Sequence, residues 1–277
     1  MASGNSIAEF SEDGNKNSNL NKRSQNPLRN KPMNIGVIFA GGTGTRMHSR
    51  DLPKQFLMIY NKPIIIYTLE YFEENEEIDA IVIACVEKWI PFLDDLLRKY
   101  QITKVRKIVP GGETGQLSIY NGLLAAKEVA QEDPAIVLIH DGVRPLITKE
   151  LLSQNIEAVK KYGSSITAGI VKETIVEINS DGSIKNVPSR EHSRVAKAPQ
   201  SFWLDDILKA HEQALKSGEK NNIDSCTLMQ KYGKRQLHMV DGPYENIKIT
   251  TPDDYFTMRA IFQAREDYQI YGLEPRD

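Results

Sequence analysis

A glycine-rich loop followed by a lysine is the segment of this 277-residue chain best suited to bind a polyphosphate. The loop reads Ala40-Gly41-Gly42-Thr43-Gly44-Thr45-Arg46-Met47, and Pro53-Lys54-Gln55 follows shortly after it. Glycines let a backbone approach phosphate oxygens and turn its N–H groups toward them. Arg46 adds a planar guanidinium fork and Lys54 a compact ammonium, both of which suit phosphate oxygens. The pattern therefore predicts phosphate binding at this loop.

Two better-known phosphate-binding loops do not fit the segment. A Walker A loop requires Gly-Lys-Ser or Gly-Lys-Thr after its glycines, whereas this loop ends Gly-Thr-Arg. A dinucleotide-binding loop reads GxGxxG, but Met47 stands where its third glycine would be, and Cys85 stands where an acidic residue would end the second strand. A hydride-transferring Rossmann protein is therefore disfavoured.

Asp141 is the candidate ligand for a divalent metal ion. It lies in His140-Asp141-Gly142-Val143-Arg144-Pro145, directly after the apolar run 135–139. Mg²⁺ prefers one or two carboxylates together with phosphate oxygens, so an aspartate at the end of a buried strand is well placed to bind it. A loop salt bridge between Asp141 and Arg144 is the plainer alternative, and His140 is expected to be packed or hydrogen-bonded rather than a metal ligand.

Three further segments carry weak signals when each is taken alone. Gly111-Gly112-Glu113, with Ser118 opening the next helix, offers backbone groups and a hydroxyl that could contact the edge of a base. Arg190 precedes Ala198-Pro199-Gln200, and Lys248 lies in Asn246-Ile247-Lys248-Ile249-Thr250. A single arginine or lysine is most often a solvated charge.

Short apolar runs that alternate with amphipathic helices would position these residues. Strands are expected at 35–40, 80–85, 105–109 and 135–139, and helices at 63–72, 89–100 and 118–129. The alternation predicts an α/β fold with a mostly parallel, Rossmann-like sheet and helices on both faces. In such sheets ligands bind beyond the carboxyl ends of the strands, where the Gly41 loop, the Gly112 loop and Asp141 fall.

The second half of the chain interrupts this alternation. Extended stretches at 172–178 and 183–187 flank Asn179-Ser180-Asp181-Gly182, which predicts a hairpin and hence an antiparallel arm at about 172–190. Further helices are expected at 203–215, 224–231 and 252–264, the last with Thr251 as its N-cap, and a strand at 236–240. We expect a single domain over 33–270.

Composition and charge exclude several classes of protein. The formal net charge is -2, which gives no basic excess for nucleic-acid binding. The chain has no apolar run of the roughly 20 residues that a membrane helix needs. Residues 1–32 are rich in Ser, Asn, Lys and Glu without an apolar core, so we expect a disordered tail rather than a signal peptide. The two cysteines fit a reducing cytoplasm, with Cys85 as a buried thiol.

Taken together, these segments resemble the cytidylyltransferases of the 2-C-methyl-D-erythritol 4-phosphate and ribitol-5-phosphate type. The resemblance covers about Asn34 to Ala264 and rests on five ordered motifs: AGGTGTRM with PKQF, GGETGQLSIYNGL, HDGVRP, the stretch from Arg190 to APQSF, and ENIKITTPDD. It implies an enzyme that uses CTP and Mg²⁺ or another divalent cation to transfer CMP onto a small polyol phosphate. It also implies a homodimer in which the arm reaches into the partner subunit.

The resemblance assigns roles residue by residue. Catalytic roles at the α-phosphate fall to Arg46, Lys54 and Lys248. The nucleotide would be surrounded by Ala40, Gly41, Gly42, Thr43, Gly44, Gly112, Glu113 and Ser118. Asp141 would help to bind the metal ion, and Arg190 and Thr174 would bind the polyol phosphate, in the neighbour's site if the arm is exchanged.

The wording of the motifs favours ribitol 5-phosphate as the acceptor over methylerythritol phosphate, with another polyol phosphate also open. Seven positions separate Met47 from Lys54, and the Pro188-Ser189-Arg190-Glu191-His192 stretch and Val143 are similar to enzymes that use ribitol phosphate. Two positions depart from the family: Gly115 replaces a common arginine, and Ala198 replaces a threonine.

The chemistry implied by the resemblance needs no general base. A phosphate monoester has a second pKa of ~6, so the acceptor is already a nucleophilic dianion near neutral pH. The difficulty is the approach of a dianion to a polyanion, which cations relieve. A non-catalytic nucleotide-binding protein remains the alternative, but it would be expected to lose charge at Arg46, Lys54, Asp141 or Lys248, and all four are present.

Overall fold

The computed structural model describes residues 31–42 and 52–271, with side chains as far as residue 268. Three of the predicted site residues, Thr43, Gly44 and Arg46, lie outside the described residues, as do residues 1–30 of the expected tail.

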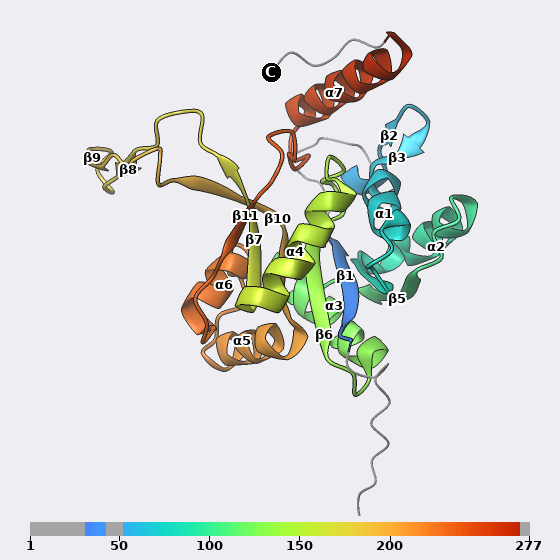
Figure 1. Ribbon diagram of the computed structural model, residues 1–277, viewed down its shortest axis with the longest axis horizontal. Helices are drawn as coiled ribbons and strands as arrows, with labels where there is room; N and C mark the ends of the chain where they lie inside the picture. Colours follow the sequence, from blue (N-terminus) through green and yellow to red (C-terminus); the bar gives the residue numbers. More distant parts are fainter. Residues whose placement is uncertain (1–30, 43–51, 272–277) are drawn as a thin grey trace, which may run out of the picture. The chain divides into compact units, whose positions relative to one another are not determined.

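Within the described residues, seven strands form one central sheet in the order β11-β7-β10-β6-β1-β4-β5 (Figure 1). The strands are β1 (Met33–Ala40), β4 (Ala80–Cys85), β5 (Val105–Pro110), β6 (Ala135–Asp141), β7 (Ser164–Ile170), β10 (Arg194–Trp203) and β11 (Met239–Asp241). β1 pairs in parallel with β4 and β6, β5 with β4, and β11 with β7. The prediction of a mostly parallel α/β sheet is confirmed.

Helices cover both faces of this sheet (Figure 1). They are α1 (Ile64–Glu74), α2 (Ile90–Lys99), α3 (Gly115–Ala130), α4 (Lys149–Tyr162), α5 (Leu204–Lys216) and α6 (Ser225–Tyr232), whereas α7 (Pro252–Tyr271) packs in a separate cluster. Successive side chains of a strand point to opposite faces, and in β1 Ile38 joins one apolar core while Val37 joins the other. The first core is closed by α1, α2 and α4, and the second by α3, α5 and α6. Burial of each such aliphatic side chain contributes about 1.5–3 kcal/mol.

The strand β10 is the main departure from the sequence-based prediction. It runs antiparallel between β6 and β7, and its register shifts between Ala196 and Gln200. Neither β10 nor β7 was expected as a strand, and α4 was not expected as a helix. The α4 helix nevertheless has ordinary ends, because the Thr148 hydroxyl caps its first turn and Gly163 ends it at φ 84°.

The predicted hairpin is present, but its paired part is short. The strands β8 (Glu177–Ile178) and β9 (Ile184–Asn186) pair only with each other among the described residues, and both are exposed. Figure 1 shows this arm extending from the ends of β7 and β10, away from the helices that cover the sheet. The arm therefore adds nothing to the two apolar cores.

A third apolar cluster attaches α7 to the rest of the fold. Its buried members include Ile59, Ile64, Ile249 and Met258, and it packs beside the small hairpin of β2 (Met58–Ile59) and β3 (Lys62–Pro63). The predicted start of α7 is confirmed, but the helix continues to Tyr271 rather than ending near 264. No helix in the described part of the chain is long and apolar enough to cross a lipid bilayer.

Candidate active site

The carboxyl ends of β1, β5 and β6 open onto a cavity of about 540 Å³. Its lining brings together predicted site residues from five separate segments, namely Ala40, Gly41, Gly42, Lys54, Gly112, Glu113, Ser118, Asp141 and Lys248. The expectation that these segments meet at one edge of the sheet agrees with the position of this cavity.

Two glycine-containing loops approach each other closely on one side of the cavity. A Cβ on Gly41 would stand 2.8 Å from the Ser118 hydroxyl and 4.0 Å from the Cα of Gly111. A Cβ on Gly112 would overlap the Cβ of Leu117. The loops therefore need glycine because backbone and helix α3 come too close together for a side chain.

Ser118 holds the second of these loops in place. Its hydroxyl accepts a hydrogen bond from Gly112 N at 3.0 Å and donates to the Thr114 carbonyl at 2.9 Å. The side chain is almost fully buried in α3, whose first turn is capped by the Thr114 hydroxyl. Ser118 thus fixes the conformation of the Gly112 loop that lines the cavity. Glu113, on the same loop, is exposed.

Lys54 reaches the cavity from the short 3₁₀ helix Lys54–Phe56. Its ammonium donates to the Ile249 carbonyl at 3.0 Å, and its Cε lies near Gly42. The neighbouring Gln55 is buried and donates to the Ala40 carbonyl at 2.7 Å, which ties the 3₁₀ helix to the end of β1. These contacts fix a positive charge beside the glycine loop.

Asp141 ends β6 and is paired with two cations. One carboxylate oxygen lies 2.5 Å from the Lys248 ammonium, and the other accepts a hydrogen bond from Arg144 Nε at 3.1 Å. Burial alone would raise the pKa of Asp141, but the charges of Arg144 and Lys248 outweigh burial and hold this pKa well below its usual range. The carboxylate is therefore ionised across the neutral pH range, and the loop salt bridge considered as an alternative is present.

Lys248 lies between Asp141 and the ring of Phe39, whose centroid is 5.5 Å from the ammonium. It lies on the segment that links β11 to α7, 107 positions after Asp141 in the chain. Lys54 and Lys248 thus enter the same cavity from distant parts of the sequence.

His140 does not point into the cavity. It is fully buried, and its Nε2 donates to the Arg144 carbonyl at 3.0 Å. Burial lowers the pKa of His140 to about 4, so the ring is neutral near pH 7. Among residues 31–42 and 52–271, no group of three or more His, Cys, Asp or Glu side chains is placed to hold a metal ion.

The structure does not bring Arg190 and Thr174 to this cavity within one chain. Both are exposed on the arm, and Arg190 donates to the Lys172 carbonyl at 3.2 Å. Neither is among the residues that line the cavity of Asp141.

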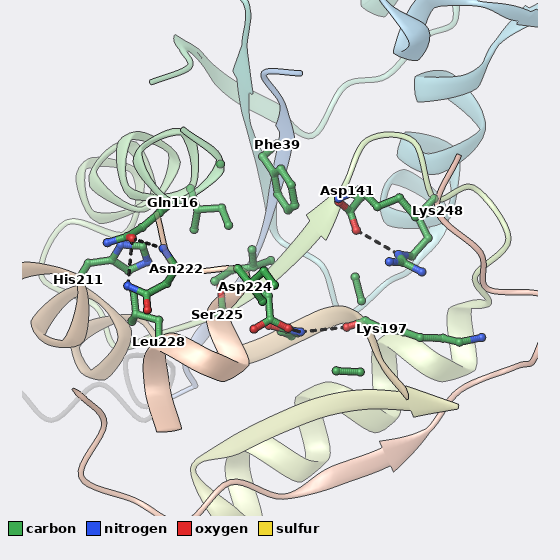
Figure 2. Close-up of a pocket in the computed structure, with 18 residues that line it drawn as sticks. Phe39, Gln116, Asp141, Lys197, His211, Asn222, Asp224, Ser225, Leu228 and Lys248 are labelled. Atoms are coloured by element: carbon green, nitrogen blue, oxygen red, sulfur yellow. Dashed lines mark hydrogen bonds and ion pairs between the residues drawn. The ribbon is translucent and has the colours of Figure 1, made fainter. Parts of the chain in front are cut away.

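A second cavity of about 180 Å³ adjoins the first and shares Phe39, Gly115, Asp141 and Lys248 with it (Figure 2). A Cβ on Gly115 would meet no atom within 4 Å, so the glycine leaves space where the two cavities join. The far end of the second cavity is lined by polar side chains from β10, α3, α5 and the start of α6.

Sequence reasoning did not assign several residues of this second cavity. Gln200 donates to Asp224 at 2.9 Å, and the Asn222 backbone N–H donates to Gln116 at 2.8 Å. Gln200 and Arg144 lie within motifs noted above, so the motifs contained a signal for them. Gln116 and Asn222 are separated by 106 positions, and no local pattern links them.

Comparison with known proteins places this geometry in a family. The model of the 2-C-methyl-D-erythritol 4-phosphate cytidylyltransferase family matches residues 35–264. The chain belongs to this family of cytidylyltransferases. The enzyme is 52% identical over 241 residues to a ribitol-5-phosphate cytidylyltransferase of Streptococcus agalactiae serotype V, covering 87% of this chain and 100% of that protein.

Two more distant relatives are named for methylerythritol phosphate. A 2-C-methyl-D-erythritol 4-phosphate cytidylyltransferase of Clostridium botulinum is 41% identical to the enzyme, over 83% of this chain and 97% of that protein. The crystal structure of 4-diphosphocytidyl-2C-methyl-D-erythritol synthase from Anaerococcus prevotii superposes with a TM-score of 0.75 at 28% identity, covering 86% of this chain and 99% of that one. The fold, the nucleotidyltransferase class and the family expected from the motifs are confirmed.

Proposed function

We propose that the enzyme transfers CMP from CTP to D-ribitol 5-phosphate, forming CDP-ribitol and releasing pyrophosphate. The proposal rests mainly on one observation: Lys54 and Lys248 line the same cavity, together with the glycine loop and Asp141. The 52% identity to the ribitol-5-phosphate enzyme supports the choice of acceptor.

We place the nucleotide against the two glycine-containing loops. Ala40, Gly112, Glu113 and Ser118 would surround the cytosine, with Ser118 acting through the loop that its hydroxyl holds. Gly41 and Gly42 would present backbone N–H groups to the triphosphate. We propose that Thr43, Gly44 and Arg46, which continue this loop in the sequence, complete the phosphate contacts.

The proposed reaction is an in-line displacement at the α-phosphorus of CTP. An oxygen of the acceptor phosphate forms the new P–O bond, and the bond from the α-phosphorus to the bridging oxygen of the leaving pyrophosphate breaks. The acceptor is already a dianion, so no residue has to remove a proton. Lys54 and Lys248 offset the charge that accumulates on the oxygens, which is the main requirement of phosphoryl-group chemistry.

Mg²⁺ fits this site as an ion held mainly by the nucleotide. Asp141 offers one ionised carboxylate at the edge of the cavity, but Lys248 and Arg144 already contact its two oxygens. A single paired carboxylate suits Mg²⁺, which usually takes one or two carboxylates and fills its other positions with phosphate oxygens and water. When bound, the ion would neutralise charge on the triphosphate.

We further propose that residues 33–270 act as one nucleotidyltransferase domain and that the arm joins two such domains in a homodimer. Large aliphatic side chains stand exposed along the arm and its base, namely Ile170, Ile175, Val176, Ile178, Ile184, Val187 and Val195. A concentration of exposed apolar side chains is typical of a protein interface. In this arrangement Arg190 and Thr174 would bind the acceptor in the neighbour's cavity. We place the reaction in the cytoplasm, since both cysteines are free thiols.

Methylerythritol phosphate is the second candidate acceptor, because the family description and the relative at 41% identity name it. The test measures pyrophosphate release from CTP and Mg²⁺ with each acceptor in a separate reaction. The proposal expects release with D-ribitol 5-phosphate and a much lower kcat/KM with methylerythritol phosphate. The reverse order would overturn the choice of acceptor but not the reaction type, and release with neither acceptor would overturn the proposal.

A further inference from the structure

Lys248 lies on a segment with little regular structure, so its position depends on particular contacts. The segment runs from Gly242 to Ile249, between β11 and α7. Gly242 N donates to the Ala168 carbonyl at 2.8 Å, and Ile249 N donates to the Val143 carbonyl at 3.0 Å, so the two ends are attached to the sheet and to the loop after β6. The residues between them carry Lys248 toward Asp141.

Lys197 binds the first half of this segment from β10. Its ammonium donates to the Pro243 carbonyl at 3.2 Å and to the Tyr244 carbonyl at 2.8 Å. The stem of Lys197 lies on Gly169 of β7, where a Cβ would stand 2.7 Å from the lysine Cε. The glycine thus leaves a path along which the lysine reaches the segment. Figure 2 shows the Lys197 side chain directed away from Asp224 and the polar end of the second cavity.

The second half of the segment is attached at the neighbouring position of β10. The fully buried Asn246 donates from its side-chain amide to the Ala198 carbonyl at 2.7 Å and accepts at its own carbonyl from Arg144 Nη1 at 2.9 Å. Arg144 also pairs with Asp141, which contacts Lys248. The hydrogen bonds of Lys197 and Asn246 therefore join the part of β10 where the register shifts to the segment that carries Lys248.

We propose that Lys197 is a positioning residue for the reaction, which holds the Gly242–Ile249 segment so that Lys248 is presented at the α-phosphate. This inference rests on the role proposed above for Lys248. Lys197 lies in the stretch between Ala196 and Gln200 where the register of β10 on β7 shifts. Its ammonium is bonded to the Gly242–Ile249 segment. Misplacement of a reacting group by ~1 Å can cost about 10²-fold in rate.

The test compares Lys197→Met with Lys104→Met. Methionine keeps an apolar stem but removes the donor, so the Pro243 and Tyr244 carbonyls lose their partner. Lys104 is the matched control, because its ammonium also donates to a backbone carbonyl, that of Asn75 at 2.6 Å, far from the cavity. We expect kcat for pyrophosphate release to fall about 10- to 100-fold in Lys197→Met while the KM for CTP changes less than about twofold. Lys104→Met is expected to keep the wild-type kcat.

A double-mutant cycle with Lys248→Met separates positioning from a general loss of structure. If Lys197 acts through Lys248, its replacement costs little further rate once Lys248 is absent. An equal fold-loss in both backgrounds would overturn the inference, as would an unchanged kcat in Lys197→Met. A rise confined to the acceptor KM would overturn it in favour of direct acceptor binding by Lys197. Should Lys197→Met melt at a lower temperature, Lys197→Arg, which keeps a charged donor, is expected to recover kcat.

The same cycle distinguishes failure of this inference from failure of the proposed function. A wild-type rate in Lys248→Met alone would remove the catalytic role of Lys248. A low rate in Lys248→Met with a wild-type rate in Lys197→Met would leave that role intact and remove only the positioning role of Lys197.

Discussion

The ammonium of Lys248 lies 2.5 Å from a carboxylate oxygen of Asp141, although 107 positions separate the two residues in the chain. The pair stands where the two cavities meet, and the carboxylate is almost fully buried. Because Arg144 pairs with the other oxygen, the group carries one net positive charge toward the place proposed for the triphosphate.

Replacement of Asp141 by asparagine is expected to separate its effects on charge and on metal binding. Asp141→Asn raises the net positive charge of the cavity, so CTP should bind more tightly without Mg²⁺. It also removes a carboxylate that would hold the metal, so the Mg²⁺ concentration needed for half-maximal rate should rise ~10- to 100-fold. Titration calorimetry with CTP and rates over a range of Mg²⁺ concentrations measure the two effects. Asp205→Asn, at an exposed ion pair with Lys127, is the control and should change neither.

The loop at Gly112 gives a matched pair of substitutions. A Cβ on Gly112 would overlap Leu117, whereas a Cβ on Gly115, three positions later, would meet nothing within 4 Å. Overpacking of this kind costs about 1–3 kcal/mol, so Gly112→Ala should weaken CTP binding by ~10-fold or more. Gly115→Ala should leave the dissociation constant of CTP near the wild-type value. Equal affinities in the two variants would contradict the close packing of the loop against α3.

The buried His211 is expected to make the free energy of unfolding sensitive to acid. It is buried in α5, stacks on Tyr120, and has no hydrogen-bond partner at either ring nitrogen in the described structure. Burial lowers the pKa of His211 to about 4, below its ordinary value of 6.5. The unfolded chain therefore binds the proton more readily between these pH values, and the free energy of unfolding falls as the pH drops through this window.

Denaturant titrations of His211→Phe between pH 7 and 4 measure this contribution. One proton changes the free energy of unfolding by about 1.4 kcal/mol per pH unit, so the variant should show a shallower loss of stability by roughly that slope. The same slope in the variant and the wild type would show that His211 is not buried in its neutral form.

The central α/β sheet could be predicted from the sequence because its strands are continuous apolar runs. The expected strand at 80–85 is β4 itself, and the expected runs at 35–40 and 135–139 form most of β1 and β6. Strands buried on both faces carry apolar side chains at successive positions, and this gives a strong local signal.

The strand β10 carried no comparable signal. Its first three residues, Arg194 to Ala196, are exposed, it contains Pro199, and its register shifts before Gln200. Proline is depleted in central strands, so the motif Ala198-Pro199-Gln200 gives no signal for a strand. The sequence does carry a signal for the α4 helix, since Thr148 and Gly163 stand at its ends.

Only part of the candidate site could be predicted from the sequence. Asp141 and the glycine loops lie at strand ends, and the topology of a parallel sheet brings such ends together. Lys248 and Lys54 come together because α7 and the segment before it pack on the hairpin β2–β3. No spacing of residues in the sequence predicts this packing. Lys197 and Asn246 act through backbone carbonyls, and contacts of that kind leave no pattern of residue types.

A charged substitution in the exposed arm is expected to change the oligomeric state of the protein. Ile178 and Ile184, which are opposed in the arm hairpin, are 62% and 64% exposed. If they are buried between two subunits, Ile178→Glu places a charge in that apolar contact, which should shift the protein from dimer to monomer. Light scattering at several protein concentrations measures the mass. Phe256→Glu, at a 61% exposed position on α7, is the control and should not change it.

In the proposed reaction an oxygen of the acceptor phosphate attacks the α-phosphorus of CTP. The direct measurement uses D-ribitol 5-phosphate whose phosphate oxygens carry ¹⁸O, with the masses of both products determined after turnover. We expect the label to stay entirely in CDP-ribitol, including the oxygen between its two phosphorus atoms, and the pyrophosphate to carry none. Label in the pyrophosphate, or release of CMP without a CDP-polyol, would contradict it.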